Sequence, residues 1–376
     1  MDVVRQIAVA VDESLTRERA HPILISVNAK RINQSPADVH GVEVAAWQPL
    51  LAAAGLLHRL APWTWMTPDE CFGLRLAPDG PPAFISVMGH GRQNHVCFAF
   101  LGWEAWLHVE ELMATRSLTV RDLIETPALQ LTFVPLADLG TEDRAILACA
   151  GPLPAGGATP CPVFRSHRTG YLPWLLNTGE VESLAEILRQ TAGVAMRRET
   201  HTDLLVPPEP GLIWMRTRQP DGQWRETWVP RPPNDDAVRP PPLDPAKLAA
   251  IAALPCRHAR IEFNLALSRA TIGEKGQRLR TTYLLAAFDS DSGQCIGADV
   301  ILPQDGLTAM WRSVPAHFLS LCLHANSRPR EIEVDSEQMM SVLRPLLGQL
   351  PIKLTLRGSL THFQTFLEGM NKINQP

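Results

Sequence analysis

The feature that most constrains this fold is a proline-rich stretch in the middle of the chain. Between Val206 and Pro245 there are 11 prolines. Proline fixes φ and lacks an amide donor, so the stretch excludes a long helix or a central strand. We expect an extended, semi-rigid connector. One hairpin, formed by Leu212 to Arg218 and Gln223 to Val229, is expected to interrupt it around the turn Pro220-Asp221-Gly222.

This stretch predicts two folded domains. Residues 1–205 form the first, residues 206–245 the connector, and residues 246–376 the second. The net charge of −4 argues against a protein that coats nucleic acid or anionic membrane over its whole surface, but it leaves room for a local basic patch. The C-terminal domain has 14 Lys and Arg against 11 Asp and Glu. It is therefore the better candidate to contact a polyanion.

The seven cysteines and the N-terminus indicate a compartment. No two cysteines lie within four residues of each other, so neither a disulfide framework nor a CxxC metal motif is indicated. Residues 1–20 lack the apolar core of a signal peptide. The most apolar window, 42–61, contains Glu43, His58 and Arg59, which argues against a membrane span. We expect a cytoplasmic protein with no membrane partner.

The N-terminal domain mixes helical and strand patterns without strict alternation, which predicts an α+β fold. Helices are expected at Val3 to Arg19 and at Val39 to Leu60, the second broken near Pro49. Ala83 to Met88 is expected to be a strand. The domain is rich in tryptophan, at Trp47, Trp63, Trp65, Trp103, Trp106 and Trp174. Core packing is the favoured interpretation, and a ligand groove is the alternative.

The C-terminal domain is patterned as an α/β fold with a mixed sheet. A hairpin is expected from Tyr283 to Phe288 and Cys295 to Leu302, with Ile261 to Leu267 as a lead-in strand. Helices and strands then alternate, and later β-α-β units favour parallel strands covered by helices. The expected elements are helix Leu307 to His324, strand Glu331 to Val334, helix Ser336 to Leu350, strand Ile352 to Leu356 and helix Leu360 to Met370.

Several short motifs resemble those of an uncharacterised family of bacterial two-domain proteins. In the N-terminal part they are Pro62-Trp63-Thr64-Trp65, Cys71-Phe72-Gly73-Leu74, Ile85 to Gly89, Leu101-Gly102-Trp103-Glu104 and Tyr171-Leu172-Pro173-Trp174. Downstream they are Arg239 to Asp244, Asp289 to Gly293 and Ser327-Arg328-Pro329. The resemblance covers most of residues 40–376 and implies only domains of unknown function.

The C-terminal element order is also similar to the RNase H-like fold of integrases and transposases. That resemblance implies an Asp on the first strand, an Asp at the end of a later strand and a Glu on a following helix, which together bind two divalent metals. Asp289, Asp335 and Glu368 match these places. The pattern departs from the fold in showing only two clear strands before the first long helix. Each acid also has an ordinary interpretation, in a turn, beside a helix start or on a solvated face.

A basic cluster precedes the expected sheet. Phosphate contact is one interpretation and a solvated loop is the other, since no aromatic residues are interleaved. Its members are Arg257, Arg260, Arg269, Lys275, Arg278 and Arg280.

Two functional hypotheses follow. The first is a binding or regulatory protein with an inactive RNase H-like module and a protein partner, with no cofactor expected. The second is a nuclease or strand-transfer enzyme that uses Mg²⁺ or Mn²⁺ at Asp289, Asp335 and Glu368, with nucleic acid bound through the C-terminal half. A small-molecule enzyme in the tryptophan-rich domain is a third and weaker alternative.

Overall fold

A computed structural model of the chain describes residues 38–89, 95–114, 120–154, 156–233, 241–274, 276–304 and 306–373. The expected helix at Val3 to Arg19 lies outside these ranges. The chain divides into two compact units, each described here by itself. The first comprises residues 1–168 and 173–234, and the second comprises 169–172 and 235–376.

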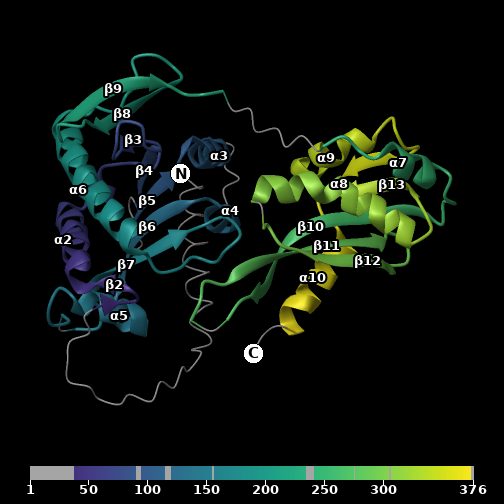
Figure 1. Ribbon diagram of the computed structural model, residues 1–376, viewed down its shortest axis with the longest axis horizontal. Helices are drawn as coiled ribbons and strands as arrows, with labels where there is room; N and C mark the ends of the chain where they lie inside the picture. The colour runs from purple at the N-terminus through teal and green to yellow at the C-terminus, as the bar shows by residue number, and fades with distance from the viewer. Residues whose placement is uncertain are drawn as a thin grey trace. The chain divides into compact units, whose positions relative to one another are not determined.

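The first unit is built on a seven-stranded sheet with helices on both faces (Figure 1). Its strand order is β7-β6-β5-β4-β3-β8-β9, and only the pair β3 and β8 is parallel. The strands are β3 (Phe72–Arg75), β4 (Ala83–Met88), β5 (Val96–Leu101), β6 (Ala128–Pro135), β7 (Pro160–His167), β8 (Leu212–Arg218) and β9 (Trp224–Pro230). A small separate ladder pairs β1 (Asp38–Val39) with β2 (Val42–Glu43).

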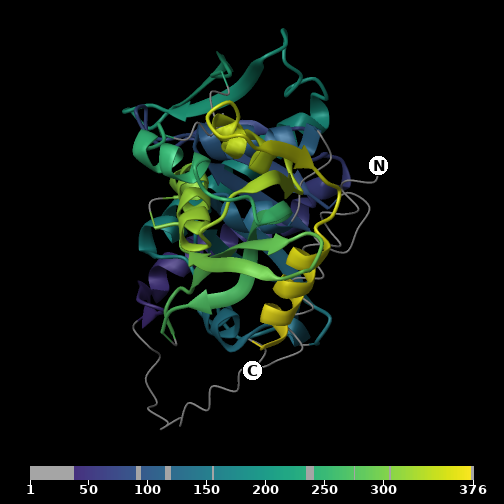
Figure 2. The same cartoon turned by 90° about the vertical axis from the view of Figure 1, so that its right-hand side faces the viewer.

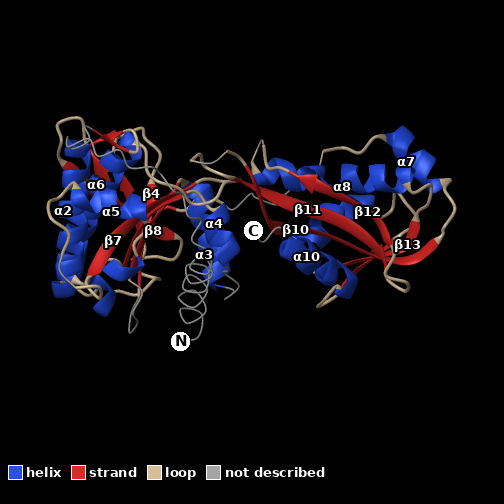
Figure 3. Cartoon of the chain, turned by 90° about the horizontal axis from the view of Figure 1, so that it is seen from below, coloured by secondary structure: helices blue, strands red, loops and turns tan. Residues whose placement is uncertain are grey.

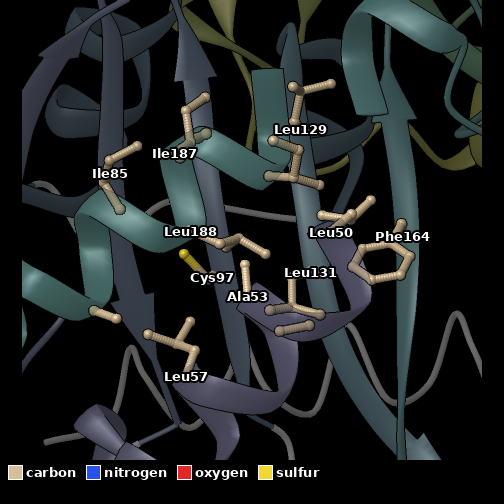
Figure 4. Packing of buried hydrophobic residues seen from close by; sticks show 14 of the residues in the cluster. Leu50, Ala53, Leu57, Ile85, Cys97, Leu129, Leu131, Phe164, Ile187 and Leu188 are labelled. Atoms are coloured by element: carbon tan, nitrogen blue, oxygen red, sulfur yellow. The ribbon is translucent and has the colours of Figure 1, made fainter. Parts of the chain in front are cut away.

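Helices α2 and α6 cover one face of this sheet, and α3 and α4 cover the other, as Figure 3 shows from below. The helices of the unit are α2 (Val44–Leu60), α3 (Trp103–Ala114), α4 (Val120–Glu125), α5 (Thr141–Ala148) and α6 (Thr178–Thr200). Each face carries an apolar cluster. Figure 4 shows the larger core, in which Leu50 and Leu57 of α2 and Leu188 of α6 meet Leu131 and Phe164 of the sheet.

Two expectations for this unit need correction. Helix α2 begins at Val44 and not at Val39, because Asp38–Val39 and Val42–Glu43 form the β1–β2 ladder, and it runs unbroken through Pro49. Pro49 has no amide hydrogen to donate to the carbonyl of Ala45, one helical turn earlier. Both residues lie on the exposed side of the helix, so water can hydrogen-bond to this carbonyl. The hairpin expected inside a connector forms strands β8 and β9 of the sheet. It packs there because Ile213, Trp214 and Met215 are all buried.

A glycine lies at the parallel junction in this sheet. Gly73 of β3 pairs with Met215 of β8. A Cβ atom at Gly73 would meet the end of the Met215 side chain, so the glycine leaves room for that side chain in its present position. The junction joins the proline-flanked hairpin to a strand that is more than 130 residues earlier in the sequence.

The second unit has a five-stranded mixed sheet of order β12-β11-β10-β13-β14. The first three strands are antiparallel neighbours, and β10, β13 and β14 are parallel. Tyr283–Phe288 and Ile352–Leu356 thus belong to one sheet, as expected. The strands are β10 (His258–Ile272), β11 (Arg280–Asp289), β12 (Cys295–Ile301), β13 (Pro329–Val334) and β14 (Lys353–Leu356).

The two faces of this sheet differ. Helices α7, α8 and α9 pack on an apolar face, and α10 packs on the other, as Figures 2 and 3 show. The helices are α7 (Pro245–Ala252), α8 (Leu307–His324), α9 (Glu337–Leu343) and α10 (Thr361–Ile373). The helix expected from Ser336 to Leu350 is shorter in the structure. It is α9, which ends at Leu343 and is followed by a 3₁₀ turn, because Pro345 has no amide hydrogen to continue the helix.

Candidate functional site

A polar strip lies on the face of the second sheet that carries α10. We define it as Glu262 and Asn264 of β10 with Glu333 and Asp335 at the end of β13. Side chains alternate along a strand, and Ile261 and its odd-numbered neighbours on β10 fill the core beneath α8. The even-numbered residues therefore face the other way. The register pairs Glu262 with Glu333.

Three members of the polar strip are buried. Glu262, Asn264 and Glu333 are exposed by 6%, 3% and 6%. Buried carboxylates and amides are costly unless they are hydrogen-bonded. The partners of each residue therefore decide whether the strip has spare capacity to hold a ligand.

Glu262 is committed to a helix terminus. Its Oε2 accepts a hydrogen bond of 2.8 Å from the backbone amide of Phe363, in the first turn of α10. The first amides of a helix lack internal partners, and the positive end of the helix dipole favours a carboxylate. Glu262 thus anchors α10 on the sheet.

Glu333 is committed to an ion pair. Arg357 donates to its Oε1 from Nη2 at 2.7 Å and from Nε at 3.0 Å. Ser290 donates from its hydroxyl to Oε2 at 2.9 Å. On the same face, hydrogen bonds from Thr355 and Lys353 lower the pKa of Glu331. These acids are balanced by donors from β14 and its end, so they are poor candidates for metal ligands.

Asn264 and Asp335 form the remaining pair. The Asn264 amide Nδ2 donates to Oδ2 of Asp335 at 2.6 Å. The other amide atom, Asn264 Oδ1, is buried and has no hydrogen-bond partner in the described part of the chain. An unmatched buried acceptor costs free energy. The pair offers a single carboxylate, already engaged on one oxygen.

Asp289 lies in a turn at the end of β11. Its Oδ1 accepts hydrogen bonds from Ser292 N and Oγ at 2.8 and 2.7 Å, and His258 Nδ1 lies 2.9 Å from Oδ2. Burial opposes ionisation, but the hydrogen bonds from Ser292 and the contact with His258 prevail and lower its pKa from 3.8 to about 2. Gly293 closes the turn with a φ of 72°, a conformation that favours glycine.

The structure does not bring Asp289, Asp335 and Glu368 together. Asp289 pairs with Ile261, whereas Asp335 bonds to Asn264, three residues further along β10. Asp289 and Asp335 are therefore about 10 Å apart in the direction of the strands. They also lie on opposite sides of β10, so two strand spacings of about 4.8 Å each separate them across the sheet. Glu368 is exposed on α10, away from the apolar stripe that packs on the sheet. Among the described residues no group of three His, Cys, Asp or Glu could hold a metal.

The basic residues also separate. Arg260 pairs with Asp291 at the start of β10, and Arg257 is exposed just before that strand. Arg280 pairs with Ile272 at the far end of the same hairpin, where its guanidinium lies over the ring of Tyr171. Arg278 precedes it, Arg269 lies within β10, and Lys275 falls outside the described residues. A 15-residue strand spans roughly 45 Å or more, so these side chains form no single patch.

In the first unit the tryptophans pack as core residues. Trp47, Trp63 and Trp106 are buried within the two apolar clusters. Trp65 and Trp103 pack against these clusters from partly exposed positions. Two grooves of this unit lie along α2 and are lined by residues other than tryptophan. Within the described ranges, no helix combines the length and apolar character needed to cross a bilayer.

Sequence reasoning missed Asn264 and Glu262. Ile261 to Leu267 was interpreted only as a lead-in strand, so the first-strand position was given to Asp289. The available signal was the alternation itself, in which Glu262 and Asn264 stand between Ile261, Phe263 and Leu265. Two polar residues inside a strongly apolar strand indicate a second, polar face.

These features define a protein of two α/β units with mixed sheets, in which the second unit carries a buried polar strip. Comparison with known families places two domains on the chain. Residues 47–216 match a domain of unknown function (DUF7309), and residues 247–371 match another (DUF6930). Together they support the resemblance to an uncharacterised two-domain family. No curated protein is similar to the chain.

Proposed function

We propose that this chain is a binding or regulatory protein whose second unit is an RNase H-like module without a working metal site. The strand order β12-β11-β10-β13-β14, with helices α8, α9 and α10 following β12, β13 and β14, supports the fold assignment. Strand β10 supplies the third strand before the long helix that the sequence pattern left in doubt. In such folds one metal-binding acid lies on the first strand and another lies at the end of a later strand. Here the first strand is β10, and the later strand is its parallel neighbour β13.

The observation that carries this proposal is the hydrogen bond between Asn264 and Asp335. Under the RNase H-like assignment that we propose, two metal-binding carboxylates are expected at this place. Mg²⁺ takes hard oxygen ligands, and two-metal catalysis needs several carboxylates around one point. Here an amide stands for one of them, and Glu262 and Glu333 are bound to the α10 amide and to Arg357. The residues of the polar strip therefore do not fit a pair of divalent metals.

The type of partner follows from charge and surface. The net charge of −4 and the dispersion of the arginines argue against broad contact with nucleic acid, so a protein partner is favoured. The seven cysteines are all unpaired, which fits a reducing compartment such as the cytoplasm. The nuclease alternative is less well supported, because its three acids lie apart.

The test is to restore the missing carboxylate. We expect the wild-type protein to show no heat of Mg²⁺ or Mn²⁺ binding at this strip and no metal-dependent cleavage of DNA, RNA or RNA–DNA hybrid. Asn264→Asp places a second carboxylate beside Asp335 and should create Mn²⁺ binding, measured by titration calorimetry.

The matched control is the double variant Asn264→Asp with Asp335→Asn. It keeps the carboxylate count of the wild type and should show no gain in metal binding. Cleavage by the wild-type protein that disappears in Asp335→Asn would overturn the proposal and establish the enzyme alternative.

A further inference from the structure

A groove of about 520 Å³ opens in the first unit, between α2 and α5. We call it the α2–α5 groove. This volume falls in the range of about 300–1,000 Å³ that is typical of small-molecule sites. Residues of α2 form one wall. The remaining lining residues are Phe133 of β6, Leu147 of α5, Ala150, and Pro160 and Pro162 of β7.

The lining is apolar apart from three side chains of α2, which are Gln48, His58 and Arg59. None of the described residues that line the groove is an aspartate or a glutamate. Pro160 and Pro162 lack amide hydrogens, and the amides of α2 are hydrogen-bonded within the helix. A bound peptide would therefore leave many of its own polar groups without partners, which is costly. The lining instead suits a ligand with one anionic group and an apolar body.

Two nitrogen-bearing side chains at one end of the groove have no protein partner. Arg59 is exposed and forms neither an ion pair nor a hydrogen bond with any residue that the structure describes. The His58 ring packs against Phe133, with centroids 4.8 Å apart, and its nitrogens are likewise without a partner in the described ranges. The groove on the other side of α2 differs, because its arginine, Arg189, pairs with Glu186. Only the α2–α5 groove thus combines an apolar lining with a cation that is not already neutralised.

A glycine widens the groove beside this cation. Gly55 lines the groove in the interior of α2, one helical turn before Arg59. Glycine destabilises a helix interior relative to alanine. A Cβ atom at Gly55 would lie 3.5 Å from Nη1 of Arg59, which is an ordinary contact, so packing within the protein does not require glycine here. The missing side chain leaves open space in the groove wall directly beside the guanidinium.

We propose that the α2–α5 groove binds a small carboxylic acid with an unbranched apolar tail, of the chemical class of a medium-chain fatty acid. The carboxylate accepts hydrogen bonds from Arg59 and His58, which lack partners in the protein. The tail lies on the apolar lining formed by Leu51, Leu147 and Pro162. Charge complementarity and burial of the tail thus act together. This site is independent of the function proposed for the second unit, because no residue of the polar strip enters it.

The test titrates the full-length protein with decanoate and with decanol, which has the same tail and no charge, by isothermal calorimetry. Arg59→Gln should weaken decanoate binding about fivefold, the size expected for loss of a solvent-exposed charge contact, and should leave decanol binding unchanged. The matched control is Arg189→Gln, the same substitution at the groove on the other side of α2. It should leave decanoate binding unchanged, because Arg189 is neutralised by Glu186.

A second pair of variants tests the place of the tail. Gly55→Leu fills the groove and should weaken the binding of both decanoate and decanol, whereas Gly55→Ala, which fits beside Arg59, should bind both nearly as the wild type does. Circular dichroism checks that both variants are folded. A wild-type protein that binds neither probe, or that binds decanol as tightly as decanoate, would overturn the proposal. Equal losses of decanoate binding in Arg59→Gln and Arg189→Gln would also overturn it.

Discussion

The two sheets of this protein differ in the kind of polar group that they bury. In the first unit both faces of the seven-stranded sheet carry apolar clusters, and strand β4 is buried along its whole length. The polar side chains buried in the described strands of this sheet, such as Gln130 and His167, which contact each other at 2.7 Å, include no carboxylate. In the second unit one face is apolar, while the other carries a small apolar patch under α10 beside the polar strip, where the carboxylates of Glu262 and Glu333 are buried.

The largest effect should come from the apolar face of β10. Phe263→Ala removes a fully buried ring that packs edge-on against Phe318. We expect the second unit to lose about 3–5 kcal/mol of unfolding free energy, measured by urea denaturation. Asn264→Ala, one residue along on the polar face, is the contrast and should cost much less. If both variants lose the same amount, the two faces do not differ in the way described.

A smaller effect is expected at Glu262, which anchors α10. Glu262→Ala leaves the Phe363 amide without its buried partner and should cost about 1–3 kcal/mol. Hydrogen exchange should localise the loss to α10 and spare α8 on the other face. Glu368→Ala, on the exposed side of the same helix, serves as the control. An unchanged exchange rate at Phe363 in Glu262→Ala would contradict the anchoring role.

The smallest effect is pH-dependent and belongs to Asp289. Its pKa is lowered to about 2 in the folded protein, so the stabilisation it provides is present above its unfolded pKa, near 4, and is lost as pH falls toward 2. Relative to Asp289→Asn, which does not titrate, wild-type stability should decline across this window. Urea denaturation between pH 5 and pH 2 measures it. A stability difference that is constant over the window would exclude a depressed pKa.

The sequence predicts the bounds of helices and strands well where a flanking turn residue and the hydrophobic pattern agree. The bounds of α8 and β4 match the expectation because Gly306 opens the first and the second is an unbroken apolar run. It fails where partners are distant in the chain. Strand β8 pairs with β3 although more than 130 residues separate them in the sequence, and no local pattern contains that information.

The candidate site was harder to predict for the same reason. That Asn264 is buried depends on its neighbours in β13 and on the placement of α10, which lies about 100 residues later in the sequence. Asp289 was prominent in the sequence because turns concentrate polar residues, yet its carboxylate is used by the turn itself. The sequence showed that Asp289 is an acidic residue at the end of a strand. Only the strand register could show that it lies at the level of Ile261, away from Asn264 and Asp335.

The anchoring of α10 by Glu262 has a consequence for biosynthesis. The carboxylate belongs to the central strand, while the amide that satisfies it is in α10, which follows every strand of this sheet in the chain. At 5–20 residues per second, the 101 residues that separate Glu262 from Phe363 take roughly 5–20 s to synthesise. During that interval the nascent sheet can be covered on its α8 side only, and the opposite side stays exposed to water until α10 has been synthesised.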